Sequence, residues 1–369
     1  MRVALAHEYF SAHGGAERVA AVLHEMWPDA PVYTFFHDVK RFGPLAGWTV
    51  RTSYLQQLPI GGGIHRVLLP LYPNAASHLR VADGTDVLVS STSAFIKGIS
   101  LPDPTVHVAY CHSPTRYLWD QSERYLADEV PAPLHPFMRE LFVRLREDDL
   151  RAAARVDRWI ANSRAVAERI RRYYRRDSTI VHPPVDTARF RPAERGDFWA
   201  FVGRLSAYKR ADIAVEVFDR IGMRLIVVGD GRERRALERR ARENVTFAGR
   251  IDDASLRDVL AAARGLIFPA EDDFGIACVE ALASGAAVVA LASGGAPDIV
   301  RDGVDGVLVE EQTVDAFEAA VLRVERKPPD RAELVRRAAQ FDRAVFTSAV
   351  ARIVDDACSA GRSGTRASA

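Results

Sequence analysis

The fold of this chain is decided by the stretch FWAFVGRLSAYKR at residues 198–210. Its apolar start followed by Gly203 predicts a buried strand that ends in a tight turn. Two cations, Arg204 and Lys209, then follow the strand's carboxyl end. In parallel sheets covered by helices, ligands bind at that edge. The stretch therefore predicts the first strand of an α/β domain. The two cations in its first loop could bind a diphosphate, or they could be ordinary surface residues.

The same alternation of short apolar runs and helical patterns continues on both sides of this stretch. Downstream, apolar runs recur at 224–228, 245–247, 266–268, 287–290 and 307–309. Upstream, they occur at 3–6, 32–35, 87–90, 106–110, 158–161 and 179–182. Strands that alternate with helices indicate parallel sheets. The predicted fold class is α/β, with two Rossmann-like domains whose parallel sheets face each other across a cleft.

The domain boundary is predicted from a break in this pattern. Pro183 and Pro184 end the first series, and the polar segment 185–194 forms the linker. We expect an N-terminal domain over 1–186 and a C-terminal domain over 187–343. A helix over about 344–358 is expected to pack back on the first domain, and 359–369 to be a disordered tail.

Composition narrows the function classes. The chain has 369 residues, with 50 Lys and Arg against 49 Asp and Glu, which argues against a dedicated nucleic-acid binder. Nine arginines between residues 151 and 176 form either a solvated helix face or a contact with an anionic membrane. The apolar segment 55–72 is likewise either an interfacial segment or an ordinary core helix. Three widely spaced cysteines and the absence of a run of ~18 apolar residues predict a cytoplasmic protein with reduced thiols.

A glycine pair closes the loop after the first predicted strand. Gly14 and Gly15 let the backbone approach a ligand, and the helix that follows offers free amides and a positive dipole end. Both features suit phosphate, although a glycine pair before a helix is often only a turn. The loop lacks the glycine fingerprint of dinucleotide-binding enzymes, which disfavours an NAD-dependent oxidoreductase.

An acidic loop follows the predicted strand that ends at Phe268. Glu271, Asp272 and Asp273 stand in the loop, and Glu280 lies about one and a half turns into the next helix. The loop acids could cap the helix. Glu280 stands among Ala, Val and Cys, and a carboxylate on an apolar face needs a partner.

His112 follows another predicted strand and is succeeded by Ser113 and Pro114. A histidine after a strand is often a structural residue, but this position at a strand end also suits a ligand contact.

Several separated segments, in this order and spacing, resemble one family. The chain resembles the family 4 retaining glycosyltransferases of the GT-B fold, closest to mannosyltransferases of O-antigen and related polysaccharide assembly. The segments that carry the resemblance are 13–17, 110–114, 162–164, 183–186, 203–210, 228–231, 271–280 and 294–297.

This resemblance implies a role for each candidate residue. Catalytic roles fall to His112 at the donor sugar, Asp272 at the sugar hydroxyls, and Arg204 with Lys209 at the leaving diphosphate. Glu280 would bind the ribose of the nucleotide. The remaining donor contacts would be mostly through backbone, and they fall on Gly14, Gly15, Gly229, Arg250, Phe274, Gly275 and Ile276. The family usually has a glutamate where this chain has Asp272, so Glu271 stays open as the alternative first acid.

The implied reaction is a retaining transfer without a metal or other cofactor. Two cations in place of a metal would stabilise the charge that develops on the leaving diphosphate. No residue stands out as a covalent nucleophile, so the acceptor would attack from the face that the leaving group departs. The expected donor is GDP-mannose, and the expected acceptor is a saccharide or polyprenyl-linked saccharide in polysaccharide biosynthesis. A UDP-sugar transferase, a GT-B sugar-nucleotide epimerase and a non-catalytic nucleotide-sugar sensor stay open as alternatives, as does peripheral contact with the inner membrane face.

Overall fold

The computed structural model describes residues 1–58 and 68–365, which form two compact units. Unit 1 contains residues 1–162 and 166–181, together with the chain from Thr347 onward. Unit 2 contains residues 163–165 and 182–346. The boundary thus falls between Val181 and His182, slightly before the predicted one after Asp186.

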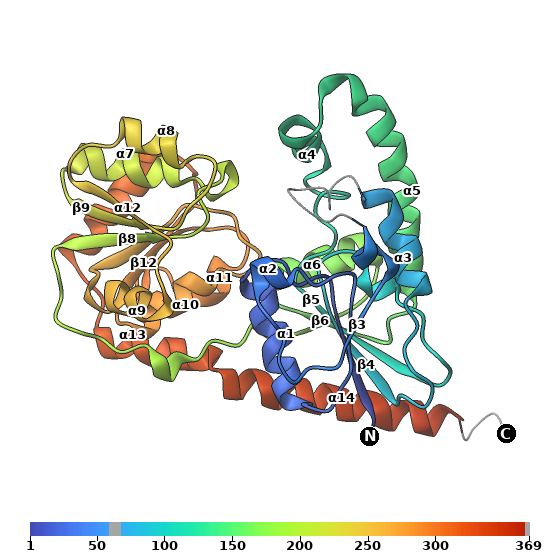
Figure 1. Cartoon of the computed structure of the whole chain (residues 1–369). Helices are drawn as coiled ribbons and strands as arrows, with labels where there is room; N and C mark the ends of the chain where they lie inside the picture. The colour runs from blue at the N-terminus through green and yellow to red at the C-terminus, as the bar shows by residue number, and fades with distance from the viewer. Residues whose placement is uncertain (59–67, 366–369) are drawn as a thin grey trace. The chain divides into compact units, whose positions relative to one another are not determined.

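Unit 1 is built on a seven-stranded parallel sheet in the order β3-β2-β1-β4-β5-β6-β7 (Figure 1). The chain first adds strands on one side of β1 and then returns to place β4 on its other side. This reversal between β1 and β4 is the topological switch point of the sheet, where α/β sheets bind ligands. The strands are β1 Val3–His7, β2 Val32–Thr34, β3 Val50–Thr52, β4 Val87–Thr92, β5 Val106–Cys111, β6 Arg158–Ala161 and β7 Thr179–Ile180.

Helices cover the sheet of unit 1 because their apolar residues recur at helical spacing. In α5, Phe142, Leu145, Asp149 and Ala152 share one buried face. The helices are α1 Gly15–Met26, α2 Val39–Phe42, α3 Tyr72–His78, α4 Ser122–Glu129, α5 His135–Ala154, α6 Arg164–Arg169 and α14 Arg343–Thr365. Shorter helical turns are η1 Tyr54–Gln57, η3 Leu69–Leu71, η4 Ile96–Gly98, η5 Ala132–Leu134 and η6 Ile170–Tyr174.

Unit 2 has a six-stranded parallel sheet in the order β10-β9-β8-β11-β12-β13. Its switch point lies between β8 and β11, because β9 and β10 continue on one side of β8 and β11 starts the other. The strands are β8 Phe198–Val202, β9 Arg224–Val228, β10 Val245–Gly249, β11 Gly265–Phe268, β12 Ala287–Leu291 and β13 Gly306–Val309.

Two hydrophobic clusters lie on the two faces of this sheet. One packs α7 and α12 against it, and the other packs α9, α10 and α13 (Figure 1). Trp199 of β8 is fully buried, and its indole N–H donates to Glu325 at 2.8 Å. The helices are α7 Ala211–Ile221, α8 Arg234–Arg240, α9 Asp253–Ala262, α10 Ile276–Ala283, α11 Ala296–Ile299, α12 Val314–Arg326 and α13 Arg331–Ala338, with the short turns η7 Thr187–Arg189, η8 Ala207–Lys209 and η9 Ala339–Phe341.

The predicted fold class, two Rossmann-like domains with parallel sheets, is confirmed. One detail of the prediction is wrong: α14 continues to Thr365, so residues 359–365 extend the helix instead of forming a disordered tail. Once a helix has formed, each further residue costs little, and the Ser359 hydroxyl bonds back to the Asp355 carbonyl at 2.9 Å.

The apolar segment predicted over 55–72 falls largely on residues 59–67, which lie outside the described residues. Of its flanks, Leu55 and Leu69 are buried in the core of unit 1, while Leu71 is exposed. No helix among the described residues is long and apolar enough to cross a membrane.

A buried ion pair fixes α5 to the core of unit 1. Lys97 and Asp149 are almost inaccessible to solvent, and Lys97 Nζ lies 2.5 Å from Asp149 Oδ1. Asp149 also accepts hydrogen bonds from Thr115, Trp119 and Tyr174, each at 2.9 Å. Every oxygen of this buried carboxylate is thus matched to a donor, as burial of a charge requires.

We predict that Asp149→Ala destabilises the protein by about 3–5 kcal/mol, because it leaves the Lys97 charge buried without its counter-ion. The neighbouring Asp148 pairs with the exposed Arg151, so Asp148→Ala should change stability by less than about 1 kcal/mol. Urea unfolding of the two variants measures the difference. Equal losses for Asp148→Ala and Asp149→Ala would contradict this account of the pair.

Candidate functional site

The loops after β8 and β9 in unit 2 touch backbone to backbone. The Gly203 amide donates to Val228 at 3.0 Å, and the Leu205 amide donates to Asp230 at 3.0 Å. Gly229 has φ +131°, and a Cβ there would lie 1.9 Å from the Gly203 carbonyl oxygen. Only glycine fits this position, so the two loops are held together at the carboxyl edge of the sheet.

The loops after β11 and β12 are joined in the same way. Gly294 has φ +63°, and a Cβ there would lie 2.0 Å from the Asp272 carbonyl oxygen. The next residue, Gly295, donates its amide to that oxygen at 2.9 Å. The backbone of the acidic loop at Asp272 is therefore fixed by its neighbour, and its side chain is left to face other groups.

An ion pair spans the switch point between these two pairs of loops. Lys209 Nζ, from the loop after β8, donates to Asp272 Oδ2, from the loop after β11, at 2.6 Å. The residues are predicted separately from the sequence, and the structure brings them into direct contact. Burial lowers the pKa of Lys209, but the charge of Asp272 and the neighbouring Tyr208 outweigh it and leave the pKa raised. Lys209 is thus a protonated cation whose ammonium also lies 5.7 Å from the Phe268 ring centre.

Of the two candidate acids, Asp272 has its backbone and its side chain in contact with neighbouring loops. Asp272 holds Lys209 at the switch point, whereas the backbone constraint from Gly294 and Gly295 fixes the residue at 272 rather than at 271. Asp272 is therefore held in contact with the loop that carries Lys209, and its role as the first acid of the site stays a prediction.

Helix α10 places the second acid of the segment. Gly275, with φ +96°, precedes the first helical residue, Ile276, and Glu280 lies farther along the helix with 4% of its surface exposed. Phe274 is buried and stacks on His182 at 5.3 Å between ring centres. The first amides of α10 therefore lie beside the acidic loop, at the carboxyl edge of β11, as the sequence predicts.

Two further predicted residues of unit 2 lie at loop surfaces of the same edge. Arg204 is exposed in the loop after β8. Arg250 is exposed directly after β10, and Gly249 accepts the Gly229 amide at 2.7 Å. Arg250 is therefore adjacent to the Gly229 loop. The structure shows no contact that fixes the orientation of the Arg204 side chain within unit 2.

In unit 1, the predicted glycine pair begins the first helix. Gly14 precedes α1 in an extended conformation, and Gly15 is its first residue. The Gly14 carbonyl accepts the Arg18 amide at 3.1 Å, which makes it part of the helix hydrogen-bond ladder. The amides of the first turn of α1 follow β1, next to the switch point of this sheet.

His112 belongs to a chain of hydrogen bonds that the sequence analysis missed. Its Nε2 lies 2.7 Å from the Ser91 hydroxyl, which in turn lies 3.1 Å from Nδ1 of His7. His7 ends β1, Ser91 stands in β4 and His112 follows β5, so the three side chains meet at the switch point. Burial lowers the pKa of His7 to about 4, and burial with the nearby His7 lowers that of His112 to about 3.

A third residue missed by the sequence analysis, Glu8, fixes the backbone of the loop after β4. One carboxylate oxygen accepts from the Thr92 hydroxyl at 3.0 Å and from the amides of Ser93 and Ala94 at 3.1 and 2.7 Å. Burial raises the pKa of Glu8, although Lys97 and these hydrogen bonds oppose the shift. The only sequence signal for His7, Ser91 and Glu8 is that polar residues end otherwise apolar strands.

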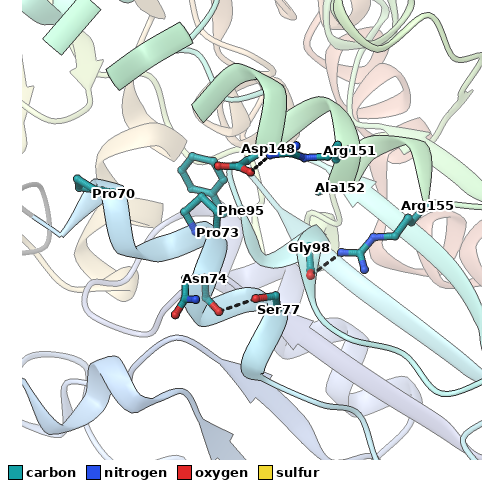
Figure 2. A pocket seen from close by; sticks show the side chains of 10 residues that line it. All are labelled: Pro70, Pro73, Asn74, Ser77, Phe95, Gly98, Asp148, Arg151, Ala152 and Arg155. Atoms are coloured by element: carbon teal, nitrogen blue, oxygen red, sulfur yellow. Dashed lines mark hydrogen bonds and ion pairs between the residues drawn. The ribbon is translucent and has the colours of Figure 1, made fainter. Parts of the chain in front are cut away.

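Unit 1 also has an open hollow of about 540 Å³ between α3, η4 and α5 (Figure 2). The Arg155 guanidinium donates to the Gly98 carbonyl at its rim, and Arg151 pairs with Asp148. None of the predicted site residues lines it. The lining residues are Pro70, Pro73, Asn74, Ser77, Phe95, Gly98, Asp148, Arg151, Ala152 and Arg155.

Comparison with known proteins agrees with this architecture. The model of "Glycosyltransferase Family 4" matches residues 13–189, and that of "Glycosyl transferases group 1" matches residues 186–341. Together the two matches span most of the chain, one on each side of the unit boundary. The chain therefore belongs to the family 4, group 1 glycosyltransferases with the GT-B fold.

Curated relatives are similar over part of their length. A D-inositol 3-phosphate glycosyltransferase of Mycolicibacterium paratuberculosis is 33% identical over 218 residues, covering 52% of this chain and 49% of that protein. A D-inositol 3-phosphate glycosyltransferase of Segniliparus rotundus is 28% identical over 299 residues, covering 68% of this chain and 66% of that protein. This chain thus spans about half the length of the first of these relatives and two thirds of the second.

Solved structures share the fold over almost the whole chain. Sucrose-phosphate synthase from Thermosynechococcus elongatus superposes with a TM-score of 0.74 at 18% identity, covering 98% of this chain and 100% of that one. The Anabaena protein HepE in complex with UDP-glucose superposes with a TM-score of 0.69 at 17% identity, covering 96% and 100%.

We predict that acid destabilises unit 1 through its neutral histidines. His7 and His107 are both buried, and burial lowers their pKa values to about 4 and about 3. In the unfolded chain they titrate near ~6.5, so the stability they contribute is present above pH ~6.5 and is lost as the pH falls toward the folded values. Each of the two histidines should lower the free energy of unfolding by about 2 kcal/mol between pH 7 and pH 5.

Urea unfolding of the wild type and of His107→Gln at both pH values measures this effect. The variant should lose about 2 kcal/mol less than the wild type over this range, while His78→Gln, at an exposed site, should behave as the wild type does. An unchanged pH dependence in His107→Gln would show that this histidine titrates normally in the folded protein.

Proposed function

We propose that this chain transfers a hexose from a nucleotide-diphosphate sugar to a saccharide acceptor, with retention of the anomeric configuration. Family membership supports the reaction class. The observation that carries the proposal is the Lys209–Asp272 pair at the switch point of unit 2, because that edge of an α/β sheet is where nucleotides bind.

The diphosphate would be neutralised by side-chain cations. Lys209 has a raised pKa and keeps its charge at neutral pH. Arg204 stands in the same loop and is exposed, so its guanidinium is accessible to a phosphate. Fixed cations lower the barrier by stabilising the negative charge that grows on the leaving oxygens. The proposed reaction therefore uses protein cations where other transferases use a divalent metal ion.

Asp272 would position both the donor sugar and the Lys209 ammonium. Its carboxylate holds the Lys209 ammonium in place before the donor binds. A side chain that is already held loses less conformational freedom when it binds phosphate. Donor binding would then share Lys209 between Asp272 and the diphosphate, leaving carboxylate oxygen to accept bonds from sugar hydroxyls. Glu280 would bind the ribose, and the first amides of α10 would face sugar and phosphate.

Unit 1 would contribute residues from its own switch point. His112 would contact the hexose near its reacting carbon, and the amides at Gly14 and Gly15 would approach the phosphate. Because no covalent nucleophile is apparent, the acceptor would attack on the face that the diphosphate leaves, and the leaving phosphate would take the acceptor proton.

For the donor we favour GDP-mannose, with UDP-sugars as the second candidate. The UDP-glucose complex of HepE, which shares this fold, supports the second. For the acceptor we favour a saccharide or polyprenyl-linked saccharide. The names of the curated relatives support inositol 3-phosphate as a second acceptor. Through exposed arginines between residues 151 and 176, the protein would bind peripherally to an anionic membrane surface.

The proposed binding function is tested by thermal shift with GDP, UDP, ADP and dTDP. We expect one of the four nucleotides to bind. At a concentration about 100 times its Kd, it should stabilise the folded protein by about 2.7 kcal/mol and raise Tm by a few degrees. Lys209→Met should weaken that nucleotide about 10- to 100-fold, because a charged hydrogen-bond donor is lost. The exposed Lys327 gives a matched control, since Lys327→Met removes the same charge elsewhere.

No shift with any of the four nucleotides, or equal weakening in both lysine variants, would contradict the proposed donor site. If binding is present, incubation with donor alone separates the alternatives: an epimerase alters the sugar without an acceptor. A sensor would bind and produce no product with any acceptor.

For catalysis, we predict that Asp272→Asn lowers kcat by about 100-fold or more, because the substitution removes a preorganised charge at the reacting sugar. Glu271→Gln makes the same chemical change one residue earlier and should stay within about threefold of the wild type. Steady-state rates measured with and without EDTA should agree. Loss of all activity with EDTA would refute metal-independent transfer, and an active Asp272→Asn enzyme would move the role to another acid.

A further inference from the structure

The switch point of unit 1 holds three polar side chains in series. His7 Nδ1 lies 3.1 Å from Ser91 Oγ, and Ser91 Oγ lies 2.7 Å from His112 Nε2. They come from three elements that are neighbours in the sheet, namely β1, β4 and the end of β5. The proposed function uses His112 alone, so the other two residues have no assigned role.

Proton counting limits how this series can be arranged. Burial keeps both imidazoles neutral at pH 7, so each carries one N–H. Ser91 has a single O–H, which it can donate to only one of the two rings. If Ser91 donates to His112, then His7 donates to Ser91; if Ser91 donates to His7, the order is reversed.

The two distances favour one direction. With an oxygen acceptor, hydrogen bonds are commonly about 2.7–2.8 Å long when a hydroxyl donates and about 2.9–3.0 Å long when a nitrogen donates. The short Ser91–His112 contact fits an O–H donated to Nε2, and the longer His7–Ser91 contact fits an N–H donated to the hydroxyl. His7 therefore carries its proton on Nδ1.

This direction leaves His112 with its proton on Nδ1. His7 and Ser91 are 2% and 1% exposed, whereas His112 is only half-buried, so the series runs from the core to an accessible ring. The backbone of His112 is fixed as well, because its amide donates to Thr92 and its carbonyl accepts from Asn162, both at 2.9 Å. The ring thus has a set position and one remaining hydrogen-bonding atom.

We propose that His7 and Ser91 are positioning residues that hold His112 in the Nδ1–H tautomer, so that it donates a hydrogen bond to an oxygen of the donor sugar. The inference rests on the proposed function in placing the sugar at His112. It adds that the contact is a donation to an acceptor oxygen. It also adds that His7 and Ser91, which are buried and do not contact the substrate, determine that His112 donates in this contact.

Unit 1 contains a matched control for this series. Ser90, the residue before Ser91 in β4, lies 2.8 Å from Nε2 of His107, and both side chains are buried. Ser90→Ala therefore removes the same kind of hydroxyl–histidine hydrogen bond from the same strand, on its opposite face. It controls for the loss of a buried hydrogen bond without touching His112.

The first test is ¹⁵N NMR of the ligand-free protein labelled at its 10 histidines, with the His112 signals assigned by their loss in His112→Gln. In the wild type, Nδ1 of His112 should be protonated and Nε2 unprotonated. Ser91→Ala should convert this to a mixture or to the opposite tautomer, and Ser90→Ala should leave it unchanged. A protonated Nε2 in the wild type would overturn the proposal.

The second test separates positioning from stability. Ser91→Ala should lower kcat about 5- to 30-fold with less than a threefold change in the KM for donor, because the tautomer affects a directed bond at the reacting sugar. His7→Phe should lower kcat in the same direction, Ser91→Thr should restore most of it, and Ser90→Ala should stay within twofold of the wild type. Equal kinetic losses in Ser90→Ala and Ser91→Ala would overturn the proposal.

The two tests also distinguish this inference from the proposed function. A protein with the expected NMR pattern but no transfer to any acceptor would contradict the function and leave the tautomer assignment intact. An active transferase with the opposite tautomer would contradict only the present inference.

Discussion

The site in unit 2 depends on the close contact between backbone loops at the carboxyl edge of its sheet. At Gly229 and Gly294 a Cβ would lie within about 2 Å of a carbonyl oxygen in the neighbouring loop. These contacts join the loops in two pairs, one on each side of the switch point. A side chain at either glycine would push the two loops of that pair apart, and the distance between Lys209 and Asp272 would change as a result.

The two switch points contain different chemistry. In unit 2, a charged pair lies at the edge where a diphosphate would develop negative charge. In unit 1, a hydroxyl and two histidines lie at the corresponding edge, and burial lowers the pKa of both histidines so that they stay neutral at pH 7. Fixed cations suit a leaving group whose charge grows, while neutral, oriented dipoles suit the hydroxyls of a sugar. This proposed division of roles rests on which residues are buried and paired.

The sequence predicted those features that are local. Apolar runs predicted most strands, including β8, β9, β11 and β12, because their burial on both faces makes them continuously apolar. The edge strand β3, Val50–Thr52, was missed since it is partly exposed and has no apolar run. The end of α14 was misplaced because composition alone gives no sign of how far an established helix continues.

Contacts between distant segments could not be predicted in this way. Lys209 and Asp272 were both singled out, but their pairing depends on β8 and β11 being neighbours in the sheet. His7 and Ser91 were not singled out at all, because each is an ordinary residue at the end of a strand. Only their alignment with His112 across β1, β4 and β5 gives them a chemical context.

The most direct measurement is a crystal structure of the protein with GDP or UDP bound. The diphosphate should lie within hydrogen-bond distance of Lys209 Nζ and the Arg204 guanidinium, with the ribose at Glu280. A nucleotide bound elsewhere, with both cations directed into solvent, would contradict this prediction.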